Sequence, residues 1–354
     1  MNTASKFPHA AAENVAFGSA GYDLINQVID AQKPSAVFVC CDEHTRIWVE
    51  PVAAKLSALT TEPTVFCMPA GESFKNLDNA VAFWHFLQQH GADRSSLVLN
   101  IGGGVVTDLG AFAASTYLRG IPFCAIPTSL LAMVDASVGG KTGLNFGSLK
   151  NQIGTFNKAL AVAIDPALLS TLPDQEWTSG HGEMVKHALL GGPSLWPSVL
   201  KLNRATLTTE DIARSVEVKA AVVRSDFQEQ NARKQLNLGH TFGHALEAVR
   251  LQEGKPLSHG AAVLQGLHVA LHLSEQHDLR DELSERYPWL GVHPAQLDAL
   301  WNAQLGDKKN ERGQVKFVLL DALGRASWNH VISRETWEHA LLELNEDLDP
   351  CRRF

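Results

Sequence analysis

The chain has 354 residues, of which 45% are hydrophobic and 19% are charged, and its formal net charge at pH 7 is −8. This length exceeds one ordinary core and predicts a globular protein of two domains. The acidic balance argues against nucleic acid as a partner. No apolar run reaches the roughly 18 residues of a membrane helix, so we expect no membrane association. The N-terminal segment lacks the pattern of a secretory signal, and five cysteines without a CxxC pair indicate reduced thiols in the cytoplasm.

The first half of the chain alternates predicted strands and predicted helices. Short β-branched and apolar runs, bounded by glycine, proline and polar residues, predict buried strands, and helical patterns lie between several of them. The strands are expected at 35–40, 64–69, 96–104, 122–128 and 161–166, and the helices at 76–91 and 105–120. This alternation predicts an α/β domain with a parallel sheet, of the Rossmann-like nucleotide-binding type.

The second half is mostly helical in pattern. Residues 167 to about 305 carry helical periodicity, a hairpin is expected within 314–332, and an amphipathic helix follows. We therefore place the domain boundary near residue 160. The expected division is an N-terminal α/β domain over 1–160 and a mostly α-helical domain over 161–354.

Two features at predicted strand ends are consistent with a nucleotide. Gly102–Gly104 stand between a predicted strand and a predicted helix, where glycine allows a phosphate to approach the backbone N–H groups of the helix start. They are not a GxGxxG fingerprint, and a plain strand–helix turn is the alternative. Asp42 follows a strand, where a carboxylate could accept the ribose hydroxyls of a dinucleotide. Its simpler interpretation is a helix N-cap.

The stretch from 134 to 156 indicates an anionic ligand. Glycines surround Lys141, and Lys150 and Asn151 follow; flexible backbone with two ammonium groups and an amide suits a phosphorylated substrate. Between residues 109 and 164, Asp135 is the only acid, against four bases: Arg119, Lys141, Lys150 and Lys158. A glycine-rich, solvated basic surface is the alternative explanation.

A carboxylate and three histidines form a candidate metal set. Glu183 and Lys186 share a helical face, as an intrahelical ion pair or as a metal ligand beside an amine. His240 and His244 are four residues apart on another predicted helix, and His259 precedes the next one. Each histidine alone is more simply a core residue, whereas together with Glu183 they suit a catalytic zinc site with an open position.

Taken together, these motifs resemble the 3-dehydroquinate synthase family over nearly the whole chain. The matching stretches are 71–75 (GESFK), 102–112, 117–145, 149–156, 182–190 and 233–247. The resemblance implies an N-terminal Rossmann-like NAD-binding domain and a C-terminal, mostly α-helical metal-binding domain, with the active site in the cleft. It also implies a cytoplasmic homodimer.

The resemblance further implies the roles of individual residues. The Zn²⁺ ligands, which Co²⁺ would also suit, would be Glu183, His240 and His259. NAD⁺ would be bound by Asp42, Gly71, Glu72, Ser73, Phe74, Lys75, Gly104, Val105, Val106, Thr107, Asp108, Thr128, Ser129, Lys141, Lys150, Leu168, Leu169, Ser170 and Thr171. The substrate would be bound by Asp135, Lys141, Asn151, Lys186, Lys219, Arg233, Asn237, His244 and either Lys308 or Lys309, with Arg119 lent by the partner subunit.

The implied substrate is a phosphorylated keto acid, 3-deoxy-D-arabino-heptulosonate 7-phosphate. In the family's reaction, NAD⁺ oxidises the C5 hydroxyl beside zinc, phosphate is eliminated with the phosphate itself as base, and NADH reduces the ketone again. Ring opening and an intramolecular aldol reaction then close the carbocycle. Arg233 and Asn237 match the carboxylate of this substrate, which related cyclases of sugar phosphates do not need to bind.

Two departures from the family and three rival functions remain. His181 and His187 stand where the family often has phenylalanine and tyrosine or histidine, respectively, and we expect both to be structural. A polyol dehydrogenase would not need the basic residues between 141 and 233. A zinc hydrolase would need a glutamate base between His240 and His244. A non-catalytic NAD-binding regulator would leave the metal set without a purpose.

Overall fold

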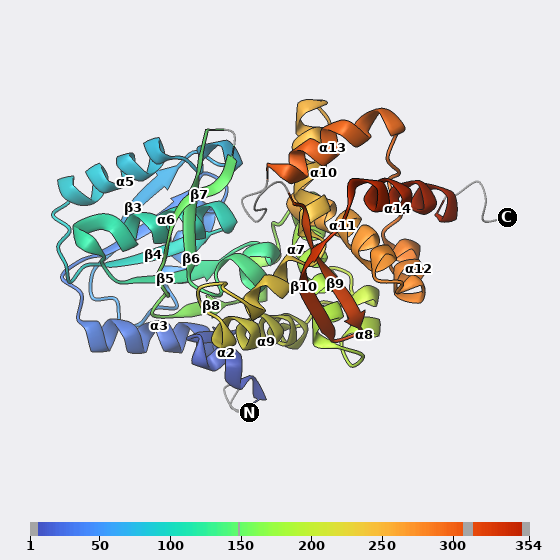
Figure 1. The fold of residues 1–354 in the computed structure, drawn as a ribbon. Helices are drawn as coiled ribbons and strands as arrows, with labels where there is room; N and C mark the ends of the chain where they lie inside the picture. Colours follow the sequence, from blue (N-terminus) through green and yellow to red (C-terminus); the bar gives the residue numbers. More distant parts are fainter. Residues whose placement is uncertain (1–5, 148, 307–313, 349–354) are drawn as a thin grey trace. The chain divides into compact units, whose positions relative to one another are not determined.

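The structure is a computed structural model that describes residues 6–147, 149–306 and 314–348 (Figure 1). The chain forms two compact units: unit 1 comprises Met1–Trp177 and Leu207–Gln228, and unit 2 comprises Thr178–Thr206 and Glu229–Phe354. Within the described ranges, every helix is too short or too polar to cross a lipid bilayer. The assignment of NAD binding to 1–160 and of metal and substrate binding to 161–354 stays a prediction.

Unit 1 contains the predicted parallel sheet. Its strands are β1 (Val15–Phe17), β2 (Val37–Asp42), β3 (Thr64–Met68), β4 (Leu97–Gly102), β5 (Phe123–Pro127) and β8 (Val162–Ile164). Their order is β1-β8-β5-β4-β2-β3, and all pairs are parallel. Every residue of β2, β4 and β5 is buried, as expected for strands covered on both faces. The predicted α/β fold is confirmed, although β1 was not expected.

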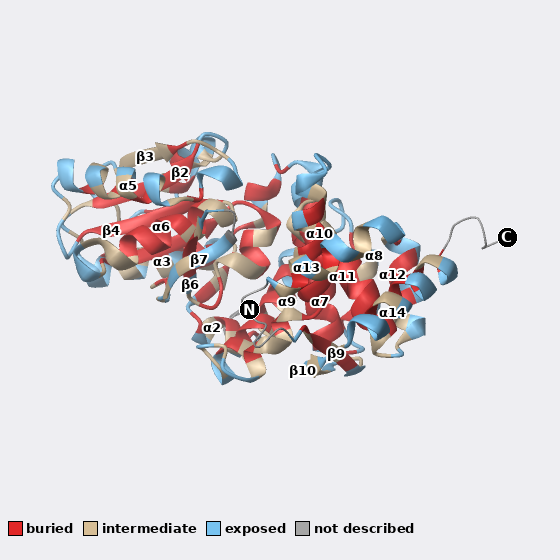
Figure 2. Ribbon diagram, turned by 45° about the horizontal axis from the view of Figure 1, so that its top comes forward, coloured by how far each residue is buried: buried red, intermediate tan, exposed pale blue. Residues whose placement is uncertain are grey.

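Helices cover the sheet of unit 1, and Figure 2 shows α6 as its most continuously buried helix. The helices of unit 1 are α2 (Pro8–Ala12), α3 (Ser19–Gln32), α4 (Val49–Ala53), α5 (Leu77–Gln89), α6 (Gly104–Thr116) and α9 (Thr209–Ser225). The position of α6 depends on Gly110, because a Cβ there would lie 2.0 Å from Asn100 Oδ1 on β4. Only glycine therefore allows α6 to approach β4 so closely.

Helix α9 belongs to unit 1, although it lies in the predominantly helical part of the sequence. A capping box at Thr208 and Asp211 begins the helix. Glu217, two turns later, accepts hydrogen bonds from the backbone N–H groups of His9 and Ala10 at 3.0 and 2.8 Å. These contacts tie α9 to α2 and place Lys219 in unit 1.

The glycine-rich stretch around Lys141 is an antiparallel hairpin and not a surface loop. Strands β6 (Lys141–Phe146) and β7 (Leu149–Phe156) pair with Gly143 opposite Gly154. A Cβ on Gly154 would lie 2.1 Å from the Thr142 carbonyl oxygen. The glycines thus permit two backbones to pack closely, which is one of the roles of glycine inside strands.

Unit 2 is mostly helical, as predicted. Its helices are α7 (Asp174–Gly191, from Thr178 onward), α8 (Trp196–Lys201), α10 (His240–Gln252), α11 (His259–Leu273), α12 (His277–Arg286), α13 (Leu297–Leu305) and α14 (Arg334–Asp347). The expected hairpin is β9 (Lys316–Ala322) with β10 (Arg325–Val331). Fully buried Trp337, Leu341 and Leu344 on α14 pack with Phe242 of α10 and Phe317 of β9 in its core.

Glycines at the crossings of α7, α10 and α11 determine the positions of the candidate metal residues. A Cβ on Gly266 of α11 would lie 1.8 Å from the Gly239 carbonyl oxygen, immediately before α10. A Cβ on Gly182 of α7 would lie 2.5 Å from the carbonyl oxygen of Gly260 on α11. The three helices therefore meet almost backbone to backbone. Residues that directly follow these glycines, such as Glu183 and His240, are brought together.

Candidate active site

One carboxylate and two imidazoles converge where these helices meet. Glu183 is fully buried, and its Oε1 lies 3.4 Å from His240 Nε2 and 3.4 Å from His259 Nε2. The other oxygen, Oε2, forms an ion pair with Nζ of buried Lys186. The predicted ion pair between Glu183 and Lys186 therefore exists. It does not exclude Glu183 as a metal ligand, because Oε1 faces both histidines.

The outer nitrogens of these two histidines also have partners. His240 Nδ1 lies 3.1 Å from the Leu238 carbonyl oxygen, and His259 Nδ1 lies 3.5 Å from Glu247 Oε2. Partners of this kind orient the Nε2 atoms of histidines that bind metals. Glu183, His240 and His259 thus offer one oxygen and two nitrogens, a donor set that fits Zn²⁺ with an open position.

His244 lies beside this group. Its ring centroid is 5.2 Å from that of His240 and 5.7 Å from that of His259. A nitrogen from each of the three histidines lies within 4.8 Å of the others, so this trio could also hold a metal ion. The structure therefore gathers all four predicted residues of the metal set and leaves two possible sets of three ligands.

The environment of His259 strongly favours a positive charge. Burial disfavours the charged ring, but hydrogen bonds to Glu183 and Glu247 outweigh burial and raise the pKa of His259 to about 9. A positive imidazolium there partly neutralises two carboxylates in the protein without a metal. A divalent cation would do the same electrostatically.

His181, two residues before Glu183 on α7, has a structural environment. Its Nδ1 lies 2.5 Å from the Tyr287 hydroxyl, and its Nε2 lies 2.9 Å from the Val199 carbonyl oxygen. The residue is fully buried, and burial lowers its pKa to about 4. His187, on the same helix, is also fully buried.

The lowered pKa of His181 predicts an acid-sensitive fold. The unfolded chain takes up a proton below pH 6.5, whereas the folded protein resists it until about pH 4, so stability is lost as the pH falls through that window. We expect wild type to lose about 2 to 3 kcal/mol more than His181→Phe between pH 7 and pH 4. Urea unfolding of both proteins at each pH measures this difference, and parallel pH profiles would contradict it.

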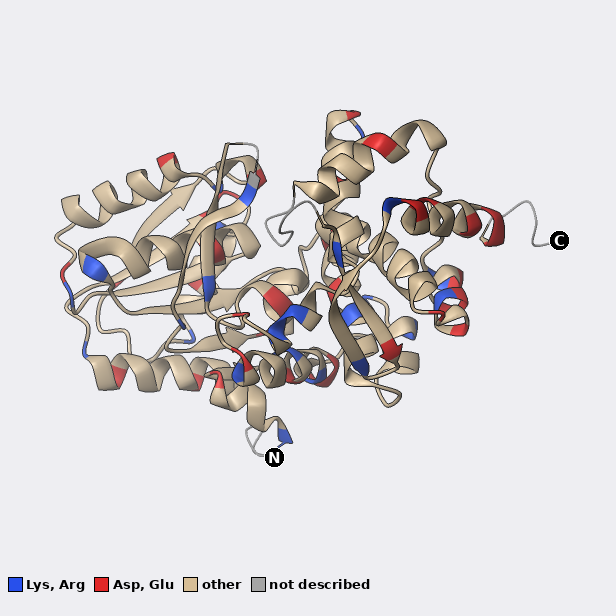
Figure 3. Ribbon diagram, in the orientation of Figure 1, with Lys and Arg blue, Asp and Glu red and all other residues tan. Residues whose placement is uncertain are grey.

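In unit 1, the predicted NAD residues follow the carboxyl ends of parallel strands. Asp42 ends β2, segment 71–75 follows β3, segment 104–108 begins α6 directly after β4, and Thr128 follows β5. Strand β3 is added on one side of β2, whereas β4 and then β5 are added on its other side, so the strand order reverses between β2 and β4. Ligands of open α/β sheets bind at such a switch point. Strands β4 and β5 carry no charged residue and are uniformly tan in Figure 3.

A buried lysine organises this edge of the sheet. Lys75 Nζ donates to Asp108 Oδ2 at 2.5 Å and to Asn151 Oδ1 at 2.6 Å. Burial raises the pKa of Asp108 and outweighs the opposing effect of Lys75. Asp42 Oδ1 accepts from the backbone N–H groups of His44 and Thr45, a local turn-capping pattern that is close to the simpler interpretation of this residue.

Other predicted residues of unit 1 lie around the β6–β7 hairpin and α9. Lys219 Nζ on α9 donates to Asp135 Oδ1 at 2.7 Å. Lys141 and Lys150 are exposed on the hairpin, and Arg119 is exposed in a turn with a left-handed φ of +71°. Ser129 is buried beside Thr128. Segment 168–171 follows β8, with its two leucines buried and Ser170 and Thr171 exposed.

In unit 2, Arg233 and Asn237 lie on one short 3₁₀ segment, Ala232–Asn237. Arg233 is 2% exposed, and Asn237 Nδ2 donates to Glu229 Oε1 at 2.8 Å. Burying a guanidinium costs free energy unless it pairs with an anion or with hydrogen-bond acceptors of the protein. Lys308 and Lys309 lie outside the described residues.

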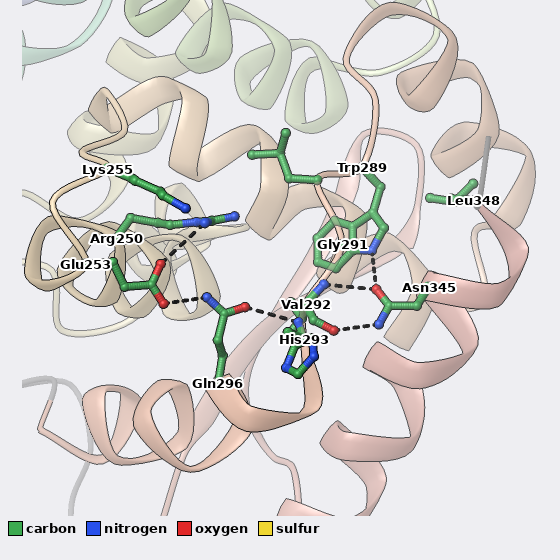
Figure 4. A pocket seen from close by; sticks show the side chains of 11 residues that line it. Arg250, Glu253, Lys255, Trp289, Gly291, Val292, His293, Gln296, Asn345 and Leu348 are labelled. Carbon is green, nitrogen blue, oxygen red and sulfur yellow. Dashed lines mark hydrogen bonds and ion pairs between the residues drawn. The ribbon is translucent and has the colours of Figure 1, made fainter. Parts of the chain in front are cut away.

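A pocket of about 790 Å³ elsewhere in unit 2 contains none of the predicted site residues (Figure 4). It is lined by the end of α10, the segment 289–296 and the end of α14. Arg250 and Lys255 lie on one wall, where Arg250 Nη1 contacts Glu253 at 3.3 Å. None of these lining residues was predicted from the sequence, and His240 of the candidate metal group lies at the opposite end of α10.

Comparisons with known proteins agree with this geometry. Family models described as the N-terminal and C-terminal parts of 3-dehydroquinate synthase match residues 65–179 and 180–310. A 3-dehydroquinate synthase of Parabacteroides distasonis is 36% identical over 88% of this chain and 92% of its own length. One from Halalkalibacterium halodurans is 38% identical over 94% of both chains.

A solved structure shares the fold over nearly its whole length. It is the 2-epi-5-epi-valiolone synthase of Streptomyces hygroscopicus, with NAD⁺ and Zn²⁺ bound. The TM-score is 0.77 at 27% sequence identity, and the match covers 94% of this chain and 96% of that one. The two family models together match residues 65–310, and the two relatives match over 88% and 94% of this chain. The chain therefore belongs to the 3-dehydroquinate synthase family.

Proposed function

We propose that this chain is a 3-dehydroquinate synthase, which converts 3-deoxy-D-arabino-heptulosonate 7-phosphate into 3-dehydroquinate and phosphate in the shikimate pathway. The observation that carries the proposal is the convergence of Glu183, His240 and His259, with Oε1–Nε2 distances of 3.4 Å. It occurs in a chain that matches a relative of this name over 94% of both lengths. These three residues would hold Zn²⁺ or Co²⁺.

The cofactor would lie against unit 1. Segments 71–75 and 104–108, with Asp42, Thr128, Ser129, Lys141, Lys150 and 168–171, would hold NAD⁺. When bound, NAD⁺ would supply a hydride acceptor that is regenerated in each turnover. The metal would supply a Lewis acid for the oxygen on the substrate carbon that loses the hydride. The N-terminus of α6 offers free backbone N–H groups to the pyrophosphate.

The residues of the chain would bind and orient the substrate. Arg233 would present a planar fork to the carboxylate, with Asn237 beside it. Lys141, Asn151, His244 and the partner subunit's copy of Arg119 would neutralise the phosphate dianion. Lys219 holds Asp135 through a 2.7 Å hydrogen bond, and Lys186 neutralises one oxygen of Glu183.

A homodimer is part of this proposal, because exposed Arg119 would serve the partner's phosphate site. A cytoplasmic location is also part of it, on the ground of the free cysteines. The test of the function compares two reactions of the protein loaded with metal and NAD⁺. A synthase releases phosphate from the heptulosonate phosphate and accumulates no NADH with glycerol. Net NADH from glycerol without phosphate release would instead identify a polyol dehydrogenase.

A further inference from the structure

Asn145, at the end of β6, was not among the predicted site residues, yet it contacts segment 71–75 three times. Its backbone N–H donates to the Lys75 carbonyl oxygen at 2.8 Å. Its side-chain Nδ2 donates to Glu72 Oε1 at 2.9 Å and, more weakly, to the Glu72 carbonyl oxygen at 3.3 Å. Asn145 therefore ties the turn that follows β3 to the β6–β7 hairpin.

The other end of the same amide contacts Asn151. Asn145 Oδ1 accepts the backbone N–H of Asn151 at 2.9 Å. Asn151 has a left-handed φ of +54°, a conformation that asparagine adopts more readily than other non-glycine residues, and this bond helps to hold it. Asn151 Oδ1 accepts in turn from Lys75 Nζ at 2.6 Å, which places the Nδ2 donor on the opposite branch of its amide.

We propose that Asn145 is a positioning residue that couples the NAD-binding segment 71–75 to the phosphate-binding amide of Asn151. The inference rests on the proposed function, because that function assigns Glu72 and Lys75 to NAD⁺ and Asn151 to phosphate. One rigid, planar amide contacts both segments through opposite ends. Ordering either segment therefore favours the bound geometry of the other, and the coupling is reciprocal.

The first measurement is the binding of NAD⁺ by calorimetry, with and without saturating inorganic phosphate. In wild type, we expect phosphate to tighten NAD⁺ binding about fivefold to tenfold, at the lower end of ordinary coupling between sites. In Asn145→Ala, we expect this factor to fall to about one. The KM for the heptulosonate phosphate should rise about tenfold, with kcat changed less than about threefold, since the loss is in positioning and binding.

Asn145→Asp separates the two halves of the contact. It keeps an oxygen that accepts the Asn151 N–H but places a carboxylate against Glu72. We expect it to weaken NAD⁺ binding while the Asn151 amide stays protected from hydrogen exchange, whereas Asn145→Ala loses that protection. Adding Glu72→Gln restores a donor opposite the new carboxylate, so the double variant should bind NAD⁺ as tightly as Glu72→Gln alone.

Asn79→Ala is the matched control. Asn79 Nδ2 donates to the Phe74 carbonyl oxygen at 3.0 Å, so the control removes an amide contact to the same turn without touching the hairpin. We expect it to keep the coupling between phosphate and NAD⁺. Equal coupling in wild type and Asn145→Ala, or no coupling in wild type, would overturn the inference. Coupling without turnover in wild type would reject the proposed function and leave the inference standing.

Discussion

His240→Ala should lose its bound zinc and all turnover, whereas His244→Ala should keep the zinc and still lose turnover. This is the expected result because His240 Nε2 and His259 Nε2 both face Glu183 Oε1 at 3.4 Å, and the outer nitrogens of both rings also have partners. Removing a ligand should weaken zinc binding by more than about 100-fold, the upper end of what losing an outer partner costs. Metal analysis of the purified proteins and a phosphate-release assay measure both effects.

The control for this pair is His277→Ala. His277 begins α12, is exposed, and has its ring centroid 5.5 Å from that of His272, away from the metal group. It should keep both zinc and turnover. Zinc lost in both variants would show that His240, His244 and His259 hold the metal. Zinc retained in His240→Ala would contradict both sets of ligands.

Arg233→Gln should lower kcat/KM for the heptulosonate phosphate by about 100-fold or more. Removing one partner of a nearly buried charge pair costs roughly 2–5 kcal/mol, and Arg233 is 2% exposed. The kcat/KM of Arg233→Lys should lie between those of wild type and Arg233→Gln, because lysine keeps the charge and lacks the planar fork that matches a carboxylate. Steady-state kinetics with the heptulosonate phosphate and with sedoheptulose 7-phosphate, which lacks the carboxylate, measure the change in preference.

The preference between the two substrates distinguishes recognition from stability. If Arg233 binds the carboxylate, the loss should be confined to the substrate that carries one. Arg250→Gln, in the separate pocket of unit 2, should leave both reactions unchanged. An equal loss on both substrates in Arg233→Gln would show that Arg233 supports the fold of the segment 232–237 and does not recognise the carboxylate.

Much of unit 1 could be predicted from local patterns. Strands β2, β4 and β5 are fully buried, and continuous apolar runs bounded by turn residues are typical of such strands. The β6–β7 hairpin could not be predicted in this way, because Gly143 and Gly154 weaken any strand pattern. Their role becomes visible only when the two backbones face each other.

The same limit applies to α9 and to Asn145. Helical periodicity predicts that α9 is a helix, but only Glu217, bonded to the start of α2, shows that it belongs to unit 1. Asn145 carried no signal of its own, since an asparagine near a turn usually has a local role. One of its partners is Glu72, which is 73 positions away in sequence.

The candidate metal group is an intermediate case. Helical spacing predicted that His240 and His244 share one face of a helix, but it could not decide which of them binds the metal. The choice of Glu183, His240 and His259 came from the resemblance to the family. The structure adds a physical reason, because glycines at the helix crossings bring Glu183 Oε1 between the two Nε2 atoms.

The most direct test of the account is the ratio of products to cofactor during many turnovers. The zinc-loaded protein should be incubated with excess 3-deoxy-D-arabino-heptulosonate 7-phosphate and a small, known amount of NAD⁺. The account predicts one phosphate and one 3-dehydroquinate per substrate consumed, far in excess of the NAD⁺ supplied, with no accumulation of NADH. Phosphate release that stops at one equivalent of NAD⁺, with NADH accumulating in step, would contradict it.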